Sequence, residues 1–307
     1  MDEFGSMFPV ESARALLDRL APDSELDSIT VAEGSFSNYT HILAAREKDG
    51  RPYRIVARRY KVFGNYDRGE KARREFKTFE LLNRHNIPAP EPLLLDESGE
   101  ILGLPGIVVS FVEGRLMLEA ASDPMDWARK LADMLADIHS IPCRKEEQEF
   151  LLKGDAEAGW FLNSENPPAY MQAYPGGSEL WSILQDRLPN LERVAPVLLH
   201  LDYWSGNILW QENEISAVID WEEAAHGDPA VDVGYAVMNI VLMGLPEAAD
   251  EFIRTYEAQT GRGLRNLGFW ELAAAVRPMI DPEDWKIHQP PGSDRFRIFV
   301  EQAKQNP

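Results

Sequence analysis

Cysteine is nearly absent from this sequence, since Cys143 is the single one in 307 residues. One thiol cannot form an internal disulfide framework or the cysteine cluster of a structural zinc site. The six histidines are scattered along the chain, and no two of them form a His-x-x-x-His pair. The sequence therefore excludes a disulfide-rich scaffold and gives no indication of a zinc centre.

Long apolar runs and basic residues are also scarce. No apolar run reaches the length that a membrane-spanning helix needs, and the N-terminal segment lacks the basic start and apolar run of a signal peptide. The chain has 31 Lys and Arg against 51 Asp and Glu, a formal charge of −20. Nucleic acids and anionic membranes are bound mainly through Lys and Arg. We therefore expect a cytoplasmic protein that binds neither nucleic acid nor membrane.

The sequence has enough apolar material for a sizeable core, because 44% of its residues are hydrophobic. Residues 26–60 form three short extended runs, and a helical segment at 67–84 precedes two further extended runs. We therefore predict an α+β fold of two lobes. Residues 1–112 form a small antiparallel sheet with one helix, and residues 113–307 form a larger, mainly helical lobe.

Helical patterns mark further segments outside the predicted sheet. They lie at 9–20, at 232–260 and at 269–277, and a helix that starts at Asp123 has a proline in its first turn.

Negative charge is concentrated in the second predicted lobe. Residues 1–112 carry 18 acidic and 15 basic residues, whereas residues 113–307 carry 33 and 16. Such an excess is typical of a solvated surface, and it also suits a site that attracts a cationic substrate.

The most informative segment is 198–235, where polar residues follow short apolar runs. Asp202 and Asn207 precede a predicted hairpin with a four-residue turn, QENE, and Asp220 follows it. Because a hairpin returns the chain to its starting end, Asn207 and Asp220 are expected side by side. Carboxylate and amide oxygens suit Mg²⁺. If Asn207 and Asp220 hold the metal, Asp202 is available to accept a proton from an attacking hydroxyl, which is the arrangement that phosphoryl transfer needs.

The motif HLDYWSGN, followed by the hairpin and IDW, resembles the aminoglycoside phosphotransferase and choline kinase-like family. The resemblance implies a protein-kinase-like fold, ATP and Mg²⁺ as cofactors, Asp202 as the catalytic base, and Asn207 and Asp220 as magnesium ligands. It also implies that His200 is a structural member of the catalytic loop, and that Asp232 braces this loop by accepting backbone hydrogen bonds.

The same resemblance extends to the first lobe. It implies a nucleotide site formed by a turn, a cation on the third strand, a Glu on the helix, and a hinge that meets the adenine. These residues are Gly34, Ser35, Ser37 and Asn38 in the turn, Arg58, Glu75, and Phe111, Val112 and Glu113 in the hinge. The family commonly has Lys where this chain has Arg58. An Arg can bind phosphate bidentately, and a Glu on an apolar stripe needs a partner, so we predict an Arg58–Glu75 pair.

We therefore predict a kinase that moves the γ-phosphate of ATP to a hydroxyl of a small molecule, such as an aminoglycoside or another amine-bearing alcohol. Trp204 and Glu222 are candidate substrate contacts. A kinase of a neutral sugar or of an amino acid such as homoserine remains open, as does a catalytically inactive nucleotide-binding module. A protein kinase is disfavoured because residues 221–231 are short and contain no Ser, Thr or Tyr. A metal-dependent hydrolase would leave the first-lobe residues unexplained.

Overall fold

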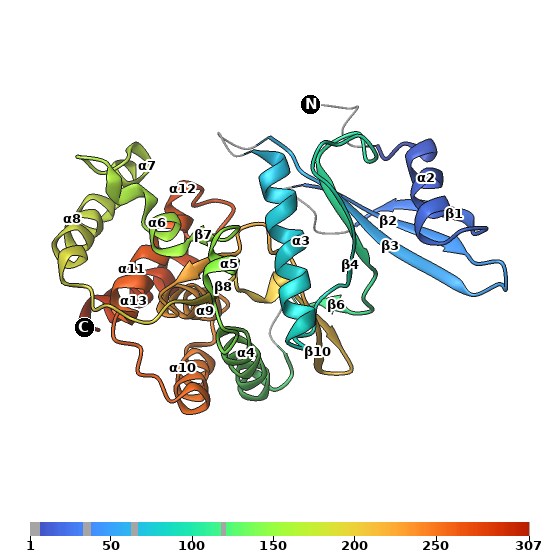
Figure 1. Cartoon of the computed structure of the whole chain (residues 1–307). Helices are drawn as coiled ribbons and strands as arrows, with labels where there is room; N and C mark the ends of the chain where they lie inside the picture. The colour runs from blue at the N-terminus through green and yellow to red at the C-terminus, as the bar shows by residue number, and fades with distance from the viewer. Residues whose placement is uncertain (1–6, 33–37, 63–66, 118–120, 307) are drawn as a thin grey trace. The chain divides into compact units, whose positions relative to one another are not determined.

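The computed structural model describes residues 7–32, 38–62, 67–117 and 121–306 (Figure 1). The chain divides into two compact units: residues 1–115 with 209–223, and residues 116–208 with 224–307. The units differ from the predicted lobes at residues 113–115 and in the segment 209–223, all of which we assigned to the second lobe. This segment groups with the first unit, where the amide of Val218 donates to the carbonyl of Pro88 (2.9 Å).

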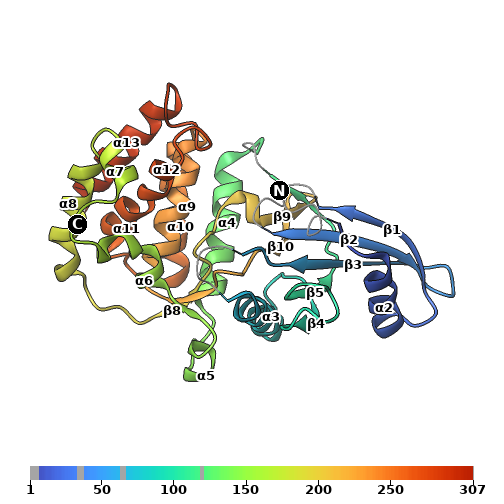
Figure 2. The same ribbon diagram turned by 90° about the horizontal axis from the view of Figure 1, so that it is seen from above.

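The first unit is built on a five-stranded antiparallel sheet in the order β1-β2-β3-β5-β4. Its strands are β1 (Glu25–Val31), β2 (Tyr39–Arg46), β3 (Pro52–Arg59), β4 (Pro92–Asp96) and β5 (Gly106–Ser110). Helix α2 (Val10–Leu20) lies beside β1 (Figure 2). Leu16 and Leu17 of this helix pack into one apolar cluster with Leu43, Ile55 and Val108 of the sheet.

Helix α3 (Arg68–Arg84) contacts β4 and β5 and carries Glu75. It begins at Asp67, whose side chain accepts a hydrogen bond from the amide of Glu70 (2.9 Å), and this cap satisfies a donor that the first turn leaves unpaired. The predicted helix over 67–84 is therefore confirmed.

The hairpin of β9 (Ile208–Gln211) and β10 (Glu214–Val218) forms a second sheet with β6 (Arg115–Leu116). The predicted hairpin is confirmed, but its turn contains two residues rather than four. Glu212 and Asn213 have φ angles of 49° and 68°. Positive φ at both central residues is the pattern of tight turns that match the twist of paired strands.

The second unit is mainly helical, with a small sheet in the order β7-β11-β8. Its helices are α4 (Pro124–His139), α5 (Lys145–Gln148), α6 (Gly154–Ala158), α7 (Ala169–Ala173), α8 (Gly177–Arg187), α9 (Ala230–Leu242), α10 (Pro246–Thr260), α11 (Leu267–Ala274), α12 (Val276–Ile280) and α13 (Gly292–Gln305). Its strands and 3₁₀ turns are β7 (Leu152–Lys153), β8 (Val197–Leu199), β11 (Ala225–Gly227), η1 (Trp160–Asn163), η2 (Leu188–Asn190) and η3 (Ser205–Asn207).

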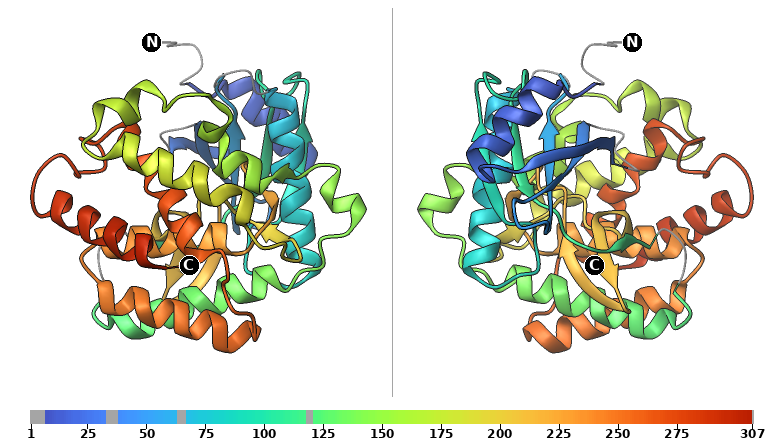
Figure 3. Two further views of the ribbon diagram at one scale, coloured as in Figure 1. Left: turned by 90° about the vertical axis from the view of Figure 1, so that its left-hand side faces the viewer. Right: turned by 90° about the vertical axis from the view of Figure 1, so that its right-hand side faces the viewer.

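Helix α9 contacts α10, α11 and α13, and α10 runs alongside α4 (Figure 3). The helical segment predicted over 232–260 is confirmed. It is two helices, α9 and α10, because Gly244 adopts a φ of 89° and Pro246 starts the next helix.

The predicted α+β fold is confirmed by an antiparallel sheet in the N-terminal part and a helical C-terminal part. Among the helices of the described residues, none is long and apolar enough to span a bilayer.

Candidate active site

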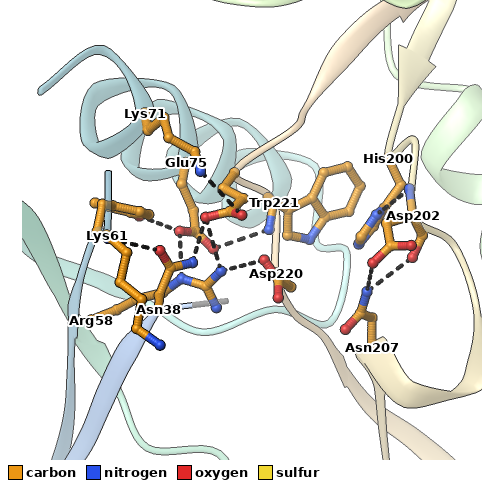
Figure 4. A network of polar contacts seen from close by, with 12 residues as sticks. Asn38, Arg58, Lys61, Lys71, Glu75, His200, Asp202, Asn207, Asp220 and Trp221 are labelled. Carbon is orange, nitrogen blue, oxygen red and sulfur yellow. Dashed lines mark hydrogen bonds and ion pairs between the residues drawn. The ribbon is translucent and has the colours of Figure 1, made fainter. Parts of the chain in front are cut away.

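The first polar cluster of the site surrounds Arg58 in the first unit (Figure 4). Arg58 lies on β3, where its register partners are Thr40 and Ile107, and Glu75 lies on α3. The predicted pair is present: Arg58 Nε is 3.1 Å from Glu75 Oε2, and the two side chains are 13% and 1% exposed. The pairing neutralises a carboxylate that burial alone would penalise strongly.

Glu75 has two further partners. The hydroxyl of Tyr60 donates to Oε2, and the backbone amide of Trp221 donates to Oε1 (3.0 Å). Burial raises the pKa of Glu75 to about 7, although Arg58 acts in the opposite direction. Helix α3, strand β3 and the segment after the hairpin are thereby joined at one carboxylate.

Asp220 and Glu222 complete this cluster from the segment that follows β10. The guanidinium of Arg58 donates to Asp220 and lies 3.3 Å from Glu222. Asp220 has a φ of 67°, a conformation that few residues other than Gly adopt without stabilising contacts. Burial opposes the charge of Arg58, but Asp220, Glu75 and Glu222 hold its pKa well above the usual value.

Glu222 is 9% exposed. Lys71 Nζ lies 3.3 Å from its carboxylate, the amide of Asn38 donates to it, and Arg74 donates to its backbone carbonyl (2.7 Å). The structure thus places Asn38 and Glu222, two residues predicted for different roles, in direct contact. Gly34, Ser35 and Ser37 of the predicted phosphate turn lie outside the described residues.

The predicted hinge residues lie beside Arg54. The guanidinium of Arg54 stacks on the ring of Phe111, 4.1 Å from its centroid, and forms an ion pair with Glu113. Phe111 also donates its amide to the carbonyl of Arg54 (3.4 Å), and Val112 lies between these residues.

The second polar cluster lies in the second unit, around the loop that follows β8. Asp232 of α9 accepts hydrogen bonds from the amides of His200 (2.7 Å) and Leu201 (2.8 Å). The predicted bracing hydrogen bonds of Asp232 are therefore confirmed. These hydrogen bonds hold Leu201 at a φ of 65°. The chain therefore turns sharply just before Asp202.

Asp232 is itself held by a buried histidine. His139 Nε2 lies 3.3 Å from its carboxylate, and Nδ1 lies 2.7 Å from the hydroxyl of Tyr256. His139 thus contributes to the support of the loop, a role that no sequence pattern indicated.

Asp202 and Asn207 are in direct contact. The amide nitrogen of Asn207 donates to the carboxylate of Asp202 (2.8 Å) and to its backbone carbonyl (2.9 Å). Nothing in the described residues donates to the amide oxygen of Asn207, and this oxygen is the atom that a hard cation would bind. The donor set of Asn207 therefore fits the predicted magnesium ligand.

Trp204 is half-buried within this loop. A Cβ atom at Gly206 would lie 2.2 Å from its ring, so a larger residue at this position would have to displace the Trp204 ring. Figure 4 shows the side chains of Asp202 and Asn207 pointing toward each other.

Several residues of the site were not predicted from the sequence. In the first unit these are Tyr60, Lys71, Arg74 and Trp221, and in the second unit Tyr235 and Arg277, of which Arg277 Nη1 lies 3.4 Å from Asp202 Oδ1. Lys71 could have been found, because it precedes Glu75 by four positions on one helix face. Arg277 follows Asp202 by 75 positions, and no local pattern connects them.

No three His, Cys, Asp or Glu side chains of the described residues form a group that could hold a metal by themselves. A metal here would depend on Asn207 or on oxygens of a bound phosphate, as the predicted site does. The proposed shared role of Asn207 and Asp220 concerns residues of different units and stays a prediction.

Relatives of this chain are known by sequence. Acyl-CoA dehydrogenase family member 11 of Gallus gallus is 27% identical over 177 residues, which cover 54% of this chain and 22% of that protein. The chain therefore spans less than a quarter of the length of this curated relative.

Solved structures of low sequence identity share the fold. A spectinomycin phosphotransferase in complex with ADP and spectinomycin has a TM-score of 0.60 at 14% identity, covering 94% of this chain and 92% of that one. The ethanolamine kinase of Plasmodium vivax has a TM-score of 0.60 at 16% identity, covering 94% and 85%. The fold is thus protein-kinase-like.

The family model covers most of the residues in the two polar clusters. The model of the phosphotransferase enzyme family matches residues 29–270, which include β2, α3, the Asp202 loop and the hairpin. Because this match covers more than half of the 307 residues, the chain belongs to the phosphotransferase enzyme family.

Proposed function

We propose that this protein transfers the γ-phosphate of ATP, with Mg²⁺, to a hydroxyl group of a small molecule. The observation that carries the proposal is the contact of Asp202 with Asn207 on a loop braced by Asp232. A carboxylate that is one-third exposed, next to an amide oxygen without a donor, suits a base beside a metal ligand. A nucleotide-binding module that performs no chemistry has no need of such a base.

In this mechanism Asp202 accepts the proton of the acceptor hydroxyl. The hydroxyl oxygen forms the new bond to the γ-phosphorus, and the bond from that phosphorus to the oxygen bridging the β- and γ-phosphates breaks, which leaves ADP. Asn207 and Asp220 would hold Mg²⁺, which neutralises the charge of the phosphates when bound.

The residues of the Arg58 cluster would bind the nucleotide. Arg58 is a rigid cation that suits phosphate oxygens, and Glu75 orients it. The backbone of the segment Phe111–Glu113 would meet the adenine. An adenine ring has donors and acceptors on one edge, which an extended backbone can match.

For the acceptor we propose an amine-bearing alcohol. Residues 113–307 have 33 acidic against 16 basic residues, a field that attracts cations. Two proteins of this fold are a spectinomycin phosphotransferase and an ethanolamine kinase. We do not propose dehydrogenase activity, because the match covers only 22% of the length of acyl-CoA dehydrogenase family member 11.

The test is ATP consumption in the presence of Mg²⁺ with a panel of aminoglycosides, ethanolamine, choline, homoserine and neutral sugars, with Asp202→Ala as the control. Turnover with an amine-bearing acceptor that the variant lacks supports the proposal. Turnover only with neutral sugars or homoserine supports the kinase activity and contradicts the proposal of an amine-bearing acceptor. ATP binding without any turnover supports the inactive module, and absence of ATP binding rejects the kinase.

A further inference from the structure

We propose that Arg277 and Tyr235 are positioning residues that orient the carboxylate of Asp202 for proton transfer. The inference rests on the proposed role of Asp202 as a base. Its three residues come from three elements of the second unit: the loop after β8, helix α9 and helix α12.

Both carboxylate oxygens of Asp202 have a partner. Asn207 donates to Oδ2 (2.8 Å), and Arg277 Nη1 lies 3.4 Å from Oδ1. Each oxygen retains a lone pair, because an ionised carboxylate has about four acceptor positions. Partners on both sides restrict rotation of the carboxylate and leave an acceptor position open for a hydroxyl proton.

Arg277 is in turn held by Tyr235. The guanidinium lies 4.7 Å from the centroid of the Tyr235 ring, within the range of a cation–π interaction. Tyr235 is 5% exposed and is packed edge-on against Trp285, at 6.5 Å between ring centroids. A buried ring of this kind gives a long, flexible Arg side chain a defined position.

The hydroxyl of Tyr235 also faces Asp202. Burial, the charge of Asp202 and a hydrogen bond with it raise the pKa of Tyr235 well above 10, so the hydroxyl keeps its proton. Tyr235 therefore acts as a neutral donor, while Arg277 supplies a charge. Together they make Asp202 part of a rigid constellation, and rigid alignment of a base with its substrate is a major source of rate enhancement.

The pairing is not a buried structural ion pair. Arg277 and Asp202 are each 33% exposed, and the separation of 3.4 Å is long for a charge-assisted hydrogen bond. An exposed single contact of this kind contributes little to stability. Its effect is therefore expected in the rate of phosphoryl transfer rather than in folding.

The test compares Arg277→Ala, Arg277→Lys and Tyr235→Phe with the wild type. Two reactions are measured. The first is transfer of phosphate from Mg·ATP to the acceptor that the panel identifies, and the second is hydrolysis of ATP by water. We expect Arg277→Ala to lower kcat by about 10- to 100-fold with KM for ATP changed by less than about 2-fold. Tyr235→Phe should lower kcat less, and Arg277→Lys should retain part of the activity.

Chemical rescue separates positioning from structural damage. Methylguanidinium added at millimolar concentration should restore part of kcat in Arg277→Ala and have no effect on the wild type. Arg297→Ala serves as the matched control, because Arg297 lies on α13 with a side chain 68% exposed and is paired at 3.9 Å with Asp294. Wild-type kcat in Arg277→Ala, or a loss accompanied by a lower Tm and not rescued, overturns the inference.

A stability cycle keeps this test apart from that of the proposed function. If the wild type neither transfers phosphate from ATP to any acceptor nor hydrolyses ATP, the proposed function fails. Tm values of Asp202→Asn, Arg277→Ala and the double variant still test the contact. A small departure from additivity, of the size expected for an exposed pair, supports the contact, and strictly additive shifts show that Arg277 does not act on Asp202.

Discussion

The two polar clusters of this protein contain the same kinds of groups in opposite settings. In the first unit, Arg58 and Glu75 are 13% and 1% exposed, and three carboxylates surround the guanidinium. In the second unit, Asp202 and Arg277 are both 33% exposed and make one long contact. The buried cluster fixes elements to one another, whereas the exposed one leaves a carboxylate open to solvent.

The difference shows why ion pairs of similar composition serve different purposes. A buried charge that loses its partner is strongly destabilising, so the residues around Arg58 depend on one another. A carboxylate that is one-third exposed, such as Asp202, remains open to solvent and to a small molecule.

The largest expected effect is on the reaction, at the exposed cluster. Asp202→Ala should lower kcat by about 10³-fold, since general-base catalysis contributes roughly 10²–10⁴-fold. The affinity for ATP, measured by calorimetry, should change by less than about 2-fold. A variant with wild-type turnover would show that Asp202 is not the base.

The next effect is on stability, at the buried cluster. Arg58→Met removes the cation between Glu75, Asp220 and Glu222 and should reduce the free energy of unfolding by about 3–5 kcal/mol, measured by urea denaturation. Arg46→Met is the matched control, because this surface Arg is 61% exposed and pairs with Asp27 at 3.2 Å. The control should lose less than about 1 kcal/mol. Equal losses in both variants would remove the distinction between the clusters.

A third effect concerns a buried carboxyl, Glu271 on α11, with which no cation of the described residues forms an ion pair. It is 3% exposed and accepts from the side-chain amide of Asn306 (2.9 Å), and burial raises its pKa from 4.5 to about 7. The folded state thus retains a proton that the unfolded state loses, so this group lowers stability as pH rises from about 4.5 to about 7.

Glu271→Gln removes this ionisation and keeps an oxygen acceptor for Asn306. It should raise the free energy of unfolding at pH 8 by about 1–3 kcal/mol, on the basis of roughly 1.4 kcal/mol per pKa unit, and change it little at pH 4.5. Urea denaturation at both pH values tests this. An equal change at both would mean that ionisation of Glu271 is not the cause.

The smallest effect concerns the cap of the helix that carries Glu75. Asp67→Ala removes the acceptor for the amide of Glu70 and should cost about 1 kcal/mol in unfolding free energy. Asp123→Ala at the start of α4, where Asp123 accepts from Met125 (3.1 Å) and Asp126 (3.0 Å), gives the corresponding measurement in the second unit. A loss of ATP affinity only in Asp67→Ala would show that the cap supports the nucleotide site.

Local patterns were sufficient to predict many of these features. The Arg58–Glu75 pair followed from a Glu on an apolar helix stripe, and the bracing role of Asp232 from the family motif; both contacts are present. The hairpin followed from two apolar runs around a polar turn, although its two-residue turn did not, because positive φ at Glu212 and Asn213 depends on strand pairing.

The sequence by itself determined the fold class, the family motif and the residues that carry charge, because these depend on periodicity and on spacing along the chain. Apart from the Arg58–Glu75 pair, only the tertiary structure decided which charges meet. Glu222 contacts Asn38 and Lys71, and Arg277 contacts Asp202, across separations of up to 184 positions. Such contacts arise from the packing of whole elements. The distant partner of a side chain therefore cannot be predicted from the residues next to it in sequence.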